Sequence, residues 1–494
     1  MEAMKAMKAM EAMDEQLEKA LKQTFGYSCF RPLQRDIMLD MIAGNDMLIL
    51  MPTGAGKSIC YQLPAIVQGG LTVVISPLIS LIYDQIADLK KLPTPVLAHY
   101  WCTGVKVSLM DIFTDVQAGL CNLLYTTPES FNNNMELRTL LKASELRRFI
   151  IDEAHCLSNW GHDFRSEYLK LNMREHFPQV SICGFTATAT KLVCADITVR
   201  LRLRDPLMWM TSYVKQNISY RVQHKEKSDW GYITGEVARF IKSEYRNETG
   251  IVYCLSRKQC EQLATSLLKF DISAGYYHAS MPPEKKTQVQ QDWLDGKLKV
   301  IVATIAFALG INKPNVRYVV HTSMPNSIEG YYQQAGRAGR DGKLSVALMY
   351  YSEKDKDALE AMIDYSQQSK SSPVTPLHRI SQMYRFCLNK EECLKVQLSN
   401  YLGEYGVKTC LKRGDPAPCG SCRAGTVCTV PLASAVNRIL TMIGDKKVNL
   451  QHVQVSASAL HDLRALNYLL NTEQLVTEVD NIEGKWTEFV WKQN

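Results

Sequence analysis

The sequence predicts an α/β protein in which two parallel-sheet units follow one another along the chain, with a cysteine-rich module and a small C-terminal domain after them. Three observations support this prediction. Apolar runs rich in β-branched residues alternate with helix-like segments up to about residue 205, and the alternation begins again at residue 249. A glycine-rich phosphate-binding pattern lies in the first series. Six cysteines gather between residues 387 and 428, after the second series.

Length and composition limit the kind of protein. A chain of 494 residues suggests about three or four domains, and 46% hydrophobic with 22% charged residues is typical of globular proteins. The net charge of +7 permits a polyanionic partner without requiring one. No apolar run reaches the roughly 18 residues of a membrane span and no signal-peptide pattern begins the chain, so we expect no membrane partner. Fifteen mostly scattered cysteines indicate a reducing compartment.

Three residues shortly before the phosphate-binding pattern suit a nucleobase. Tyr27 can stack on a base, and Gln34 can pair with the donor and acceptor edge of adenine. Arg31 lies between these two residues in the sequence. The same stretch is explained equally well by an ordinary helix start with Pro32 in its first turn. On spacing alone, both interpretations stay open.

The phosphate-binding pattern is Met51–Ser58, which follows an apolar run that predicts a buried strand and precedes a helix-like segment. Strand, glycine-rich turn and helix is the setting that such a loop requires. Glycines let backbone N–H groups approach phosphate oxygens, a lysine reaches the β- and γ-phosphates, and a serine ligates Mg²⁺. We therefore predict ATP and Mg²⁺ binding by Thr53, Gly54, Ala55, Gly56, Lys57 and Ser58. Because Met51 replaces the first glycine of the full pattern, a chance surface loop is the alternative.

Asp152 and Glu153 directly follow a predicted strand about 95 residues after Lys57. Ligands bind at the carboxyl ends of strands in parallel sheets. We predict that Asp152 holds Mg²⁺ and that Glu153 orients and deprotonates the attacking water. A solvated acidic turn is the alternative. The predicted strands of this first series include Met47–Met51, Leu71–Ile75, Leu120–Tyr125, Arg148–Ile151 and Val180–Cys183.

The second series contains the stretch Tyr331–Asp341 with two arginines, Arg337 and Arg340. If this stretch is helical, the two arginines lie on one face, and an arginine that reaches a γ-phosphate acts as an arginine finger. A plain basic turn is the alternative. The predicted strands of this series are Thr249–Cys254, Ser273–Tyr277, Lys299–Ala303, Val316–His321 and Ser345–Tyr350.

The last part of the chain predicts a metal site and a small domain. A C-x-x-C pair at Cys419 and Cys422, with cysteines before it, suits tetrahedral thiolate zinc, but six cysteines compete for four positions. Residues 430–494 are typical of a small winged helix, although a plain packing domain is nearly as good an interpretation. Its predicted elements are helices at Ala433–Ile443 and Ser456–Leu470 and a hairpin of Leu475–Val479 with Trp486–Trp491.

Over about residues 17–425, the chain resembles a RecQ-type DNA helicase of superfamily 2, nearest the Bloom-type branch. The matching stretches are Phe25–Gln34, Met51–Ser58, Ile75–Leu81, Asp152–Arg165, Thr186–Thr190, Ala303–Phe307, Gly310–Pro314 and Gly336–Gly342. The tryptophan-containing extension after Asp152-Glu-Ala-His separates this family from other helicases. The resemblance implies two RecA-like lobes with ATP between them, a helical zinc-binding module and a winged-helix domain.

The resemblance also implies roles for individual residues. Tyr27, Arg31 and Gln34 are expected to hold adenine. Arg340 is expected to be the finger, with Arg337 in support. An aromatic-rich loop is expected to couple single-stranded DNA to ATP hydrolysis through Asn159, Trp160, His162, Phe164 and Arg165. Aromatic side chains stack on any base and basic ones meet phosphates, although without the resemblance the aromatic residues are better explained as core.

For the metal, the Bloom-type spacing selects four zinc ligands, leaves Cys387 and Cys428 as spares, and implies a structural ion. The four ligands are Cys393, Cys410, Cys419 and Cys422. The expected boundaries are a low-complexity extension at 1–16, lobes at 17–206 and 207–352, the zinc-binding module at 353–429 and the winged-helix-like domain at 430–494.

The expected function is an ATP-dependent 3′-to-5′ DNA helicase of the nucleus that acts on single-stranded and branched DNA in repair and recombination. The resemblance suggests a type I topoisomerase and a single-strand-binding protein as partners. Two rivals stay open: a DNA-stimulated ATPase or strand annealer with little unwinding, and a non-hydrolysing nucleic-acid-binding relic. The relic is favoured by departures from the family pattern at Ala55, Ala308, Leu309, Asn312 and Gln334.

Overall fold

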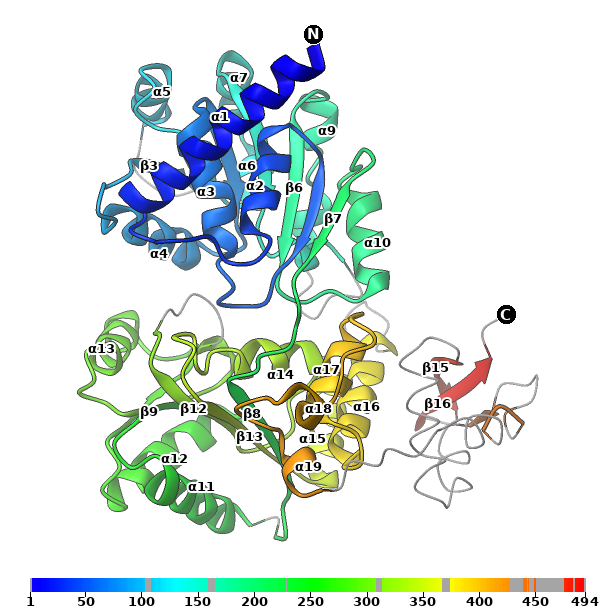
Figure 1. Ribbon diagram of the computed structural model, residues 1–494. Coiled ribbons are helices and arrows are strands. Elements are labelled where there is room, and N and C mark those ends of the chain that lie inside the picture. The colour runs from blue at the N-terminus through cyan, green and yellow to red at the C-terminus, as the bar shows by residue number, and fades with distance from the viewer. Residues whose placement is uncertain are drawn as a thin grey trace. The chain divides into compact units, whose positions relative to one another are not determined.

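The computed structural model describes residues 2–102, 108–158, 165–227, 229–307, 313–366 and 374–425, with short stretches at 439–441, 443, 448–449, 475–482 and 485–492. The chain divides into two compact units, Met1–Ser212 and Tyr213–Asn494 (Figure 1). Each unit is built around its own parallel sheet, as the sequence predicts. Among the described residues, no helix is long and apolar enough to cross a membrane.

The first unit contains a seven-stranded parallel sheet in the order β3-β4-β2-β5-β6-β1-β7. Its inner strands are continuous apolar runs because helices cover both faces. The strand β7 pairs with β1, so this sheet extends past the expected boundary at residue 206. The strands are β1 Met47–Leu50, β2 Leu71–Ile75, β3 Ala98–Trp101, β4 Leu123–Thr126, β5 Leu146–Ile151, β6 Ser181–Thr186 and β7 Leu207–Met210.

The helices of the first unit begin with α1, Glu2–Gln23, which runs through the expected low-complexity extension and into the first expected lobe as one helix. Methionine, alanine, lysine and glutamate all favour helix, and Leu17 and Leu21 are buried one turn apart. The other helices are α2 Gln34–Ile42, α3 Lys57–Gln68, α4 Ile79–Lys90, α5 Leu109–Gln117, α6 Pro128–Asn133, α7 Met135–Ala143, η1 Ala154–Leu157, α8 Ser166–Leu169, α9 Met173–His176 and α10 Lys191–Arg200.

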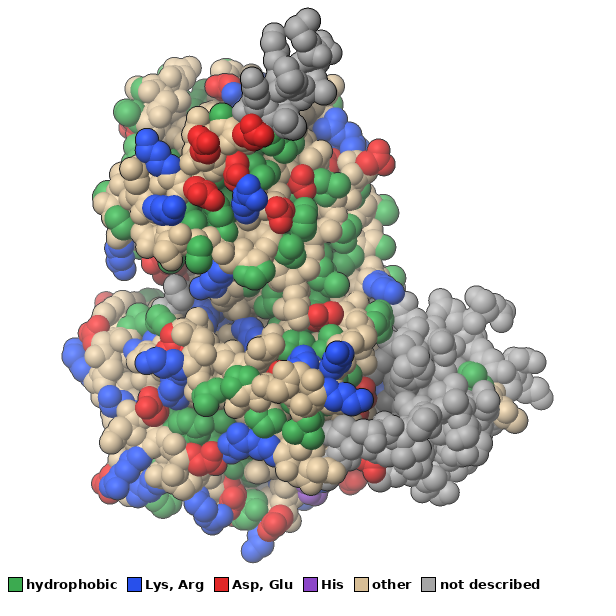
Figure 2. All heavy atoms as spheres, viewed as in Figure 1, with side chains coloured by type: hydrophobic (Ala, Val, Ile, Leu, Met, Phe, Trp, Pro, Cys, Tyr) green, Lys and Arg blue, Asp and Glu red, His purple; other side chains and the backbone are tan. Residues whose placement is uncertain are grey.

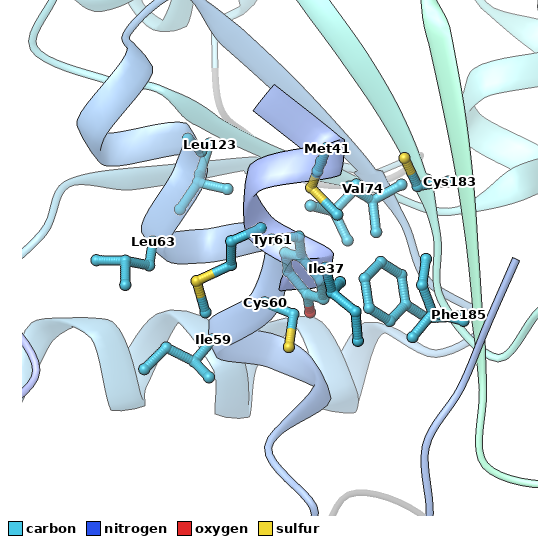
Figure 3. Packing of buried hydrophobic residues seen from close by; sticks show 14 of the residues in the cluster. Ile37, Met41, Ile59, Cys60, Tyr61, Leu63, Val74, Leu123, Cys183 and Phe185 are labelled. Carbon is cyan, nitrogen blue, oxygen red and sulfur yellow. The ribbon is translucent and has the colours of Figure 1, made fainter. Parts of the chain in front are cut away.

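The core of the first unit lies between the sheet and the helices α1 to α4 (Figure 3). Ile37 and Met41 of α2 and Tyr61 of α3 pack on the strand residues, and the Tyr61 ring meets Phe185 edge to face with centroids 5.4 Å apart. Burying each such side chain stabilises the fold by about 1.5–3 kcal/mol. This packing holds α3, whose first residue is Lys57, firmly on the sheet.

The second unit contains a six-stranded parallel sheet in the order β10-β11-β9-β12-β13-β8. All five predicted strands of this series are confirmed, and β8 adds an edge. The strands are β8 Ile218–His224, β9 Thr249–Tyr253, β10 Ala274–Tyr277, β11 Val300–Ala303, β12 Val316–His321 and β13 Ser345–Tyr351. The helices are α11 Trp230–Glu244, α12 Arg257–Lys269, α13 Pro283–Leu294, η2 Ile305–Phe307, α14 Ile328–Ala335, α15 Glu353–Ser366, α16 Val374–Leu388, α17 Leu394–Tyr401, α18 Cys410–Arg413 and α19 Gly420–Arg423.

The C-terminal stretches form a three-stranded antiparallel sheet of β14 Val448–Asn449, β15 Leu475–Ile482 and β16 Lys485–Lys492. The predicted hairpin is confirmed, with strands that continue closer to the turn than expected. Residues 439–441 and 443 are helical, whereas the rest of the two predicted helices lies outside the described residues. The winged-helix assignment therefore stays a prediction.

Candidate active site and metal centre

The phosphate-binding pattern forms the turn between β1 and α3. Gly54 and Gly56 have φ angles of 84° and 90°, in the left-handed region that favours glycine. A Cβ atom on Gly56 would lie 2.5 Å from Nε2 of Gln34, so this glycine also makes room for a neighbour. Ala55 is not among the described residues with positive φ, so an alanine fits there without backbone strain.

Two of the residues expected to hold adenine brace this loop. The Gln34 amide donates to the carbonyl oxygens of Ala55 at 3.3 Å and Gly56 at 3.2 Å, and its Oε1 accepts the Arg31 backbone N–H at 2.9 Å. The Arg31 guanidinium donates to the carbonyl oxygen of Gly54. These contacts fix the loop backbone, a role that the sequence did not indicate. Contact of these residues with adenine stays a prediction, as does stacking by Tyr27, which is 55% exposed.

The structure brings Lys57 together with the two predicted carboxylates. Nζ of Lys57 lies 3.6 Å from Oε1 of Glu153, which follows the end of β5. The Glu153 N–H donates to Oδ1 of Asp152 at 3.0 Å. Glu153 has a φ of 48°, which is uncommon for a residue with a side chain and costs of order 1–3 kcal/mol. The fold therefore holds this carboxylate in a strained backbone position that faces the phosphate loop.

The electrostatics of this site follow from burial. Burial raises the pKa of Asp152 to about 6, with a further increase from the charge of Glu153 and an opposing effect from Lys57. Burial also lowers the pKa of His155 to about 3, and the positive charges of Lys57 and Arg165 lower it further. The His155 imidazole is therefore neutral at physiological pH, whereas the pKa of Asp152 lies much closer to physiological pH.

Residues that the sequence did not single out complete the site. Nδ1 of His155 lies 2.9 Å from Oγ1 of Thr186 and 3.4 Å from Oε2 of Glu153. Thr186 ends β6 and also bonds the backbone of Thr188. The hydroxyl of Tyr168 donates to the carbonyl oxygen of Asp152 at 3.0 Å. The only sequence signal for this connection was that His155 and Thr186 both lie in stretches that match the family.

The predicted DNA-coupling loop is described only at its end. Asn159, Trp160, His162 and Phe164 lie outside the described residues, as do the departures at Ala308, Leu309 and Asn312. The structure places Arg165 with Nη1 donating to the carbonyl oxygen of Pro77 at 2.7 Å. Two stretches that match the family, Ile75–Leu81 and Asp152–Arg165, are therefore joined within the first unit.

The arginine stretch of the second unit is a turn rather than a helix. α14 ends at Ala335, and residues 336–342 form successive turns before β13. The condition for placing both arginines on one helical face is therefore not met, since the helix ends before Arg337 and Gly339, between the two arginines, has a left-handed φ of 60°. Arg337 is buried, and burial together with the charge of Arg337 lowers the pKa of Arg340 to about 9.

Gln334, where the family has glutamate, points to a histidine. Its Oε1 lies 2.8 Å from Nε2 of His321, and both side chains are buried. Burial lowers the pKa of His321 to about 4, so that a neutral amide faces a neutral imidazole. An amide is thus compatible with this buried position beside His321.

Four cysteines of the second unit converge as a metal centre. The Sγ atoms of the four expected ligands are buried and all lie within 4.8 Å of one another, with 3.3 Å between Cys393 and Cys410 and 3.8 Å between Cys393 and Cys419. Zn–S bonds of about 2.3 Å in a tetrahedron separate the sulfur atoms by about 3.8 Å, so the site fits zinc. Hydrogen bonds from Cys410 and Cys419 lower the pKa of Cys393, whereas hydrogen bonding to Cys393 raises the pKa of Cys410 and Cys419, and burial raises that of Cys422. A bound metal ion would supply the positive charge that keeps all four as thiolates. Cys387 lies outside the cluster, and Cys428 lies outside the described residues.

Three protein families match the chain in the order that this architecture suggests. They are the DEAD/DEAH box helicase over residues 31–196, the helicase conserved C-terminal domain over residues 235–342, and the RecQ zinc-binding family over residues 353–424. The last match covers the four-cysteine centre. The chain belongs to the RecQ family.

Curated RecQ relatives align with most of this chain. It is 40% identical to the RecQ-like DNA helicase blm-1 of Caenorhabditis elegans, over 83% of this chain and 42% of the relative. It is 39% identical to the RecQ-like DNA helicase BLM of Xenopus laevis, over 79% and 29%, and 36% identical to the ATP-dependent helicase SGS1 of Saccharomyces cerevisiae, over 82% and 28%. The RecQ chain thus spans less than half the length of these relatives.

Solved structures share the fold of this RecQ chain. The helicase MrfA bound to DNA aligns with a TM-score of 0.57 at 17% identity, over 76% of this chain and 53% of that one. Saccharomyces cerevisiae Dbp5 bound to RNA and ADP BeF3 aligns with a TM-score of 0.54 at 16% identity, over 72% and 92%. At such identities the likeness concerns the two α/β lobes and not the chemistry.

Proposed function

We propose that this RecQ protein is an ATP-dependent DNA helicase that moves 3′-to-5′ on single-stranded DNA and unwinds duplex or branched DNA. The observation that carries the proposal is the convergence of Lys57, Asp152 and Glu153 beside the phosphate loop. A lysine, one carboxylate that can hold a metal ion, a second that can accept a proton, and backbone N–H groups at one helix start are the parts that phosphoryl transfer uses. The relatives' names, which describe DNA helicases, support the choice of DNA.

In the proposed mechanism the loop from Thr53 to Ser58 binds the triphosphate. The Lys57 side chain gives up its contact with Glu153 and binds the phosphates instead. Ser58 and Asp152 would hold Mg²⁺, which neutralises phosphate charge when bound. Glu153 then accepts the proton of the attacking water, with His155 and Thr186 holding its surroundings. Arg340 stabilises the transferred phosphate, and the different affinities for ATP and its products drive movement along DNA.

The zinc centre serves the fold and not the chemistry, because four thiolates leave no open position on the metal. Contacts with DNA are proposed for Arg165 and the four aromatic-loop residues before it. On the face shown in Figure 2, basic side chains of the described residues are interspersed with acidic ones, so this face offers DNA no single basic patch. A role in repair and recombination in the nucleus, with a type I topoisomerase and a single-strand-binding protein as partners, is part of the proposal.

The decisive experiment compares unwinding of 3′-tailed and 5′-tailed duplexes, with ATP hydrolysis measured with and without single-stranded DNA. We expect DNA-stimulated hydrolysis and unwinding of the 3′-tailed substrate only. Stimulated hydrolysis without unwinding of either substrate would favour the ATPase or strand annealer. DNA binding without hydrolysis would favour the relic.

A further inference from the structure

A seven-residue segment, Tyr213–Ser219, leads into β8 and contacts the arginine turn through side chains. Nζ of Lys215 donates to the carbonyl oxygen of Gly336 at 2.9 Å. Nδ2 of Asn217 donates to the carbonyl oxygens of Gly339 at 2.8 Å and Lys343 at 3.0 Å. All these residues belong to the second unit.

Two of these carbonyl acceptors directly precede an arginine in the sequence. Gly336 directly precedes Arg337, and Gly339 directly precedes Arg340. Each carbonyl belongs to the peptide group that enters an arginine, so a hydrogen bond to it limits rotation of that peptide plane. The orientation of the backbone fixes the direction of the Cα–Cβ bond. By restraining the two peptide groups, Lys215 and Asn217 therefore restrain the direction in which each arginine side chain leaves the backbone.

The two glycines provide the space for these donors. A Cβ atom on Gly336 would lie 3.0 Å from Nζ of Lys215, and one on Gly339 would lie 2.4 Å from Nδ2 of Asn217. Gly339 additionally has a φ of 60°. The glycine spacing around the arginines is thus explained by close approach of the segment, which the sequence alone did not indicate.

The opposite side of the segment is held by the zinc-binding module. Nζ of Lys395 donates to the carbonyl oxygen of Gln216 at 3.1 Å, and the Tyr213 N–H donates to Glu404 at 2.7 Å. The hydroxyl of Ser219 donates to the carbonyl oxygen of Pro418, next to a zinc ligand, at 2.7 Å. The segment is therefore fixed between the module and the turn, and gives its two donors a rigid base.

We propose that Lys215 and Asn217 are positioning residues for Arg337 and Arg340. The proposal rests on the proposed function, in which Arg340 stabilises the transferred phosphate. Two arginines on one turn repel each other, so the turn needs anchors that keep both guanidinium groups in place before nucleotide arrives. A displacement of about 1 Å at such a group can reduce turnover by about a hundredfold.

Asn217→Asp tests the proposal most directly, because aspartate keeps the size of asparagine but cannot donate to the two carbonyl oxygens. We expect kcat for DNA-stimulated ATP hydrolysis to fall by at least about tenfold, with KM for ATP within threefold of the parent value. Lys215→Met should change kcat in the same direction, and Lys215→Arg, which keeps a donor, should restore much of it. Gln216→Ala is the matched control, since this exposed residue contributes its backbone carbonyl and should keep parent turnover.

Hydrogen exchange provides a readout that does not depend on hydrolysis. Without nucleotide, the amides of residues 336–343 should exchange faster in Asn217→Asp and Lys215→Met than in the parent or Gln216→Ala. If Asn217→Asp loses zinc or fails to fold, Lys215→Met decides the question. Unchanged exchange at the turn, or a higher KM with unchanged kcat, would overturn the proposal. A parent without ATPase activity would instead refute the proposed function, while faster exchange in the variants would still support the anchoring of the turn.

Discussion

The charged sites of the two units differ in how they balance charge. In the first unit, Lys57 lies 3.6 Å from Glu153, and Asp152 adds a half-buried carboxylate next to Glu153. In the second unit, two like charges, Arg337 and Arg340, share one turn. The carboxylate of that turn, Asp341, is bound by Arg317 at 2.6 Å.

This difference shows that two sites proposed to act on the same nucleotide can be stabilised in different ways. The first site carries opposite charges that stabilise each other before a ligand binds, so its residues should act on chemistry directly. The second site gathers positive charge, which favours an anion but must be held in place by the surrounding backbone contacts. We expect the second unit to depend more strongly on its scaffold, including the metal centre.

Removal of the metal should give the largest effect of the variants considered. It should damage the second unit and leave the first unit able to bind nucleotide. Zinc binding in such modules supplies roughly 10–16 kcal/mol of folding free energy, and residues 402–425 contain few large apolar side chains. Cys419→Ser should therefore lose zinc and make the second unit sensitive to protease. The measurement is zinc per chain by elemental analysis, together with limited proteolysis.

Cys387→Ala is the control for this prediction, because Cys387 is buried outside the cluster. It should keep one zinc per chain, as should Cys428→Ser. Nucleotide binding at the first unit should survive in Cys419→Ser. Full zinc content in that variant would refute the assignment of ligands.

Lys57→Ala should nearly abolish hydrolysis and tests the first site. Loss of one preorganised charge contact costs about 3–4 kcal/mol in the transition state, or roughly a thousandfold in kcat. Binding of single-stranded DNA should be retained. Steady-state ATPase assays and a DNA-binding titration measure both. The control is Lys142→Ala, an exposed lysine on α7, and ATPase activity within twofold of the parent in Lys57→Ala would exclude the phosphate-loop assignment.

Arg340→Ala should lower kcat on the order of a hundredfold with KM for ATP changed only several-fold, since a finger acts mainly in the transition state. Arg337→Ala should be less damaging, because it is assigned a supporting role. Both variants are compared by steady-state kinetics with saturating single-stranded DNA. A larger loss in Arg337→Ala would reverse the assignment of the two arginines.

The smallest expected effect is a pH dependence that belongs to the first site. Binding of Mg²⁺ and nucleotide requires ionised Asp152, whose pKa is raised from 3.8 to about 6. Affinity for nucleotide with Mg²⁺ should therefore fall by about fourfold between pH 7.5 and pH 5.5, and Asp152→Asn should lose this dependence. Calorimetric titration at the two pH values measures it, and equal affinities in the parent would contradict the assigned pKa.

Ligand binding is a better readout of Asp152 than unfolding. A raised carboxyl pKa means that the folded state binds protons more tightly, so the free energy of unfolding falls as pH rises from about 4 to 6. His155, with a pKa lowered from 6.5 to about 3, has the opposite effect, since stability is lost as pH falls below 6.5. The two effects overlap and oppose each other in unfolding experiments.

Local sequence patterns were sufficient to predict the alternation of strands and helices, the phosphate loop and the position of the paired carboxylates. These features depend on local patterns, namely apolar periodicity and glycines at fixed offsets, which act over one strand and one turn. Even a precise boundary followed from such a pattern, since the predicted strand Leu71–Ile75 matches β2 at both ends. The family match extended this information to residues whose roles the patterns alone left open.

The residues that brace the sites could be identified only from contacts within the folded chain. Gln34 donates to loop carbonyls that lie 21 and 22 residues away in the sequence. His155 contacts Thr186 at a sequence separation of 31 residues, and Asn217 contacts Gly339 at a separation of 122 residues. Of the five cysteines of the cluster that the structure describes, four have Sγ atoms within 4.8 Å of one another, and Cys387 lies apart from them. The two arginines lie in a turn after the end of α14, where Gly339 adopts a left-handed φ and another segment packs closely. Each decision depends on contacts between distant parts of the chain, which no local pattern encodes.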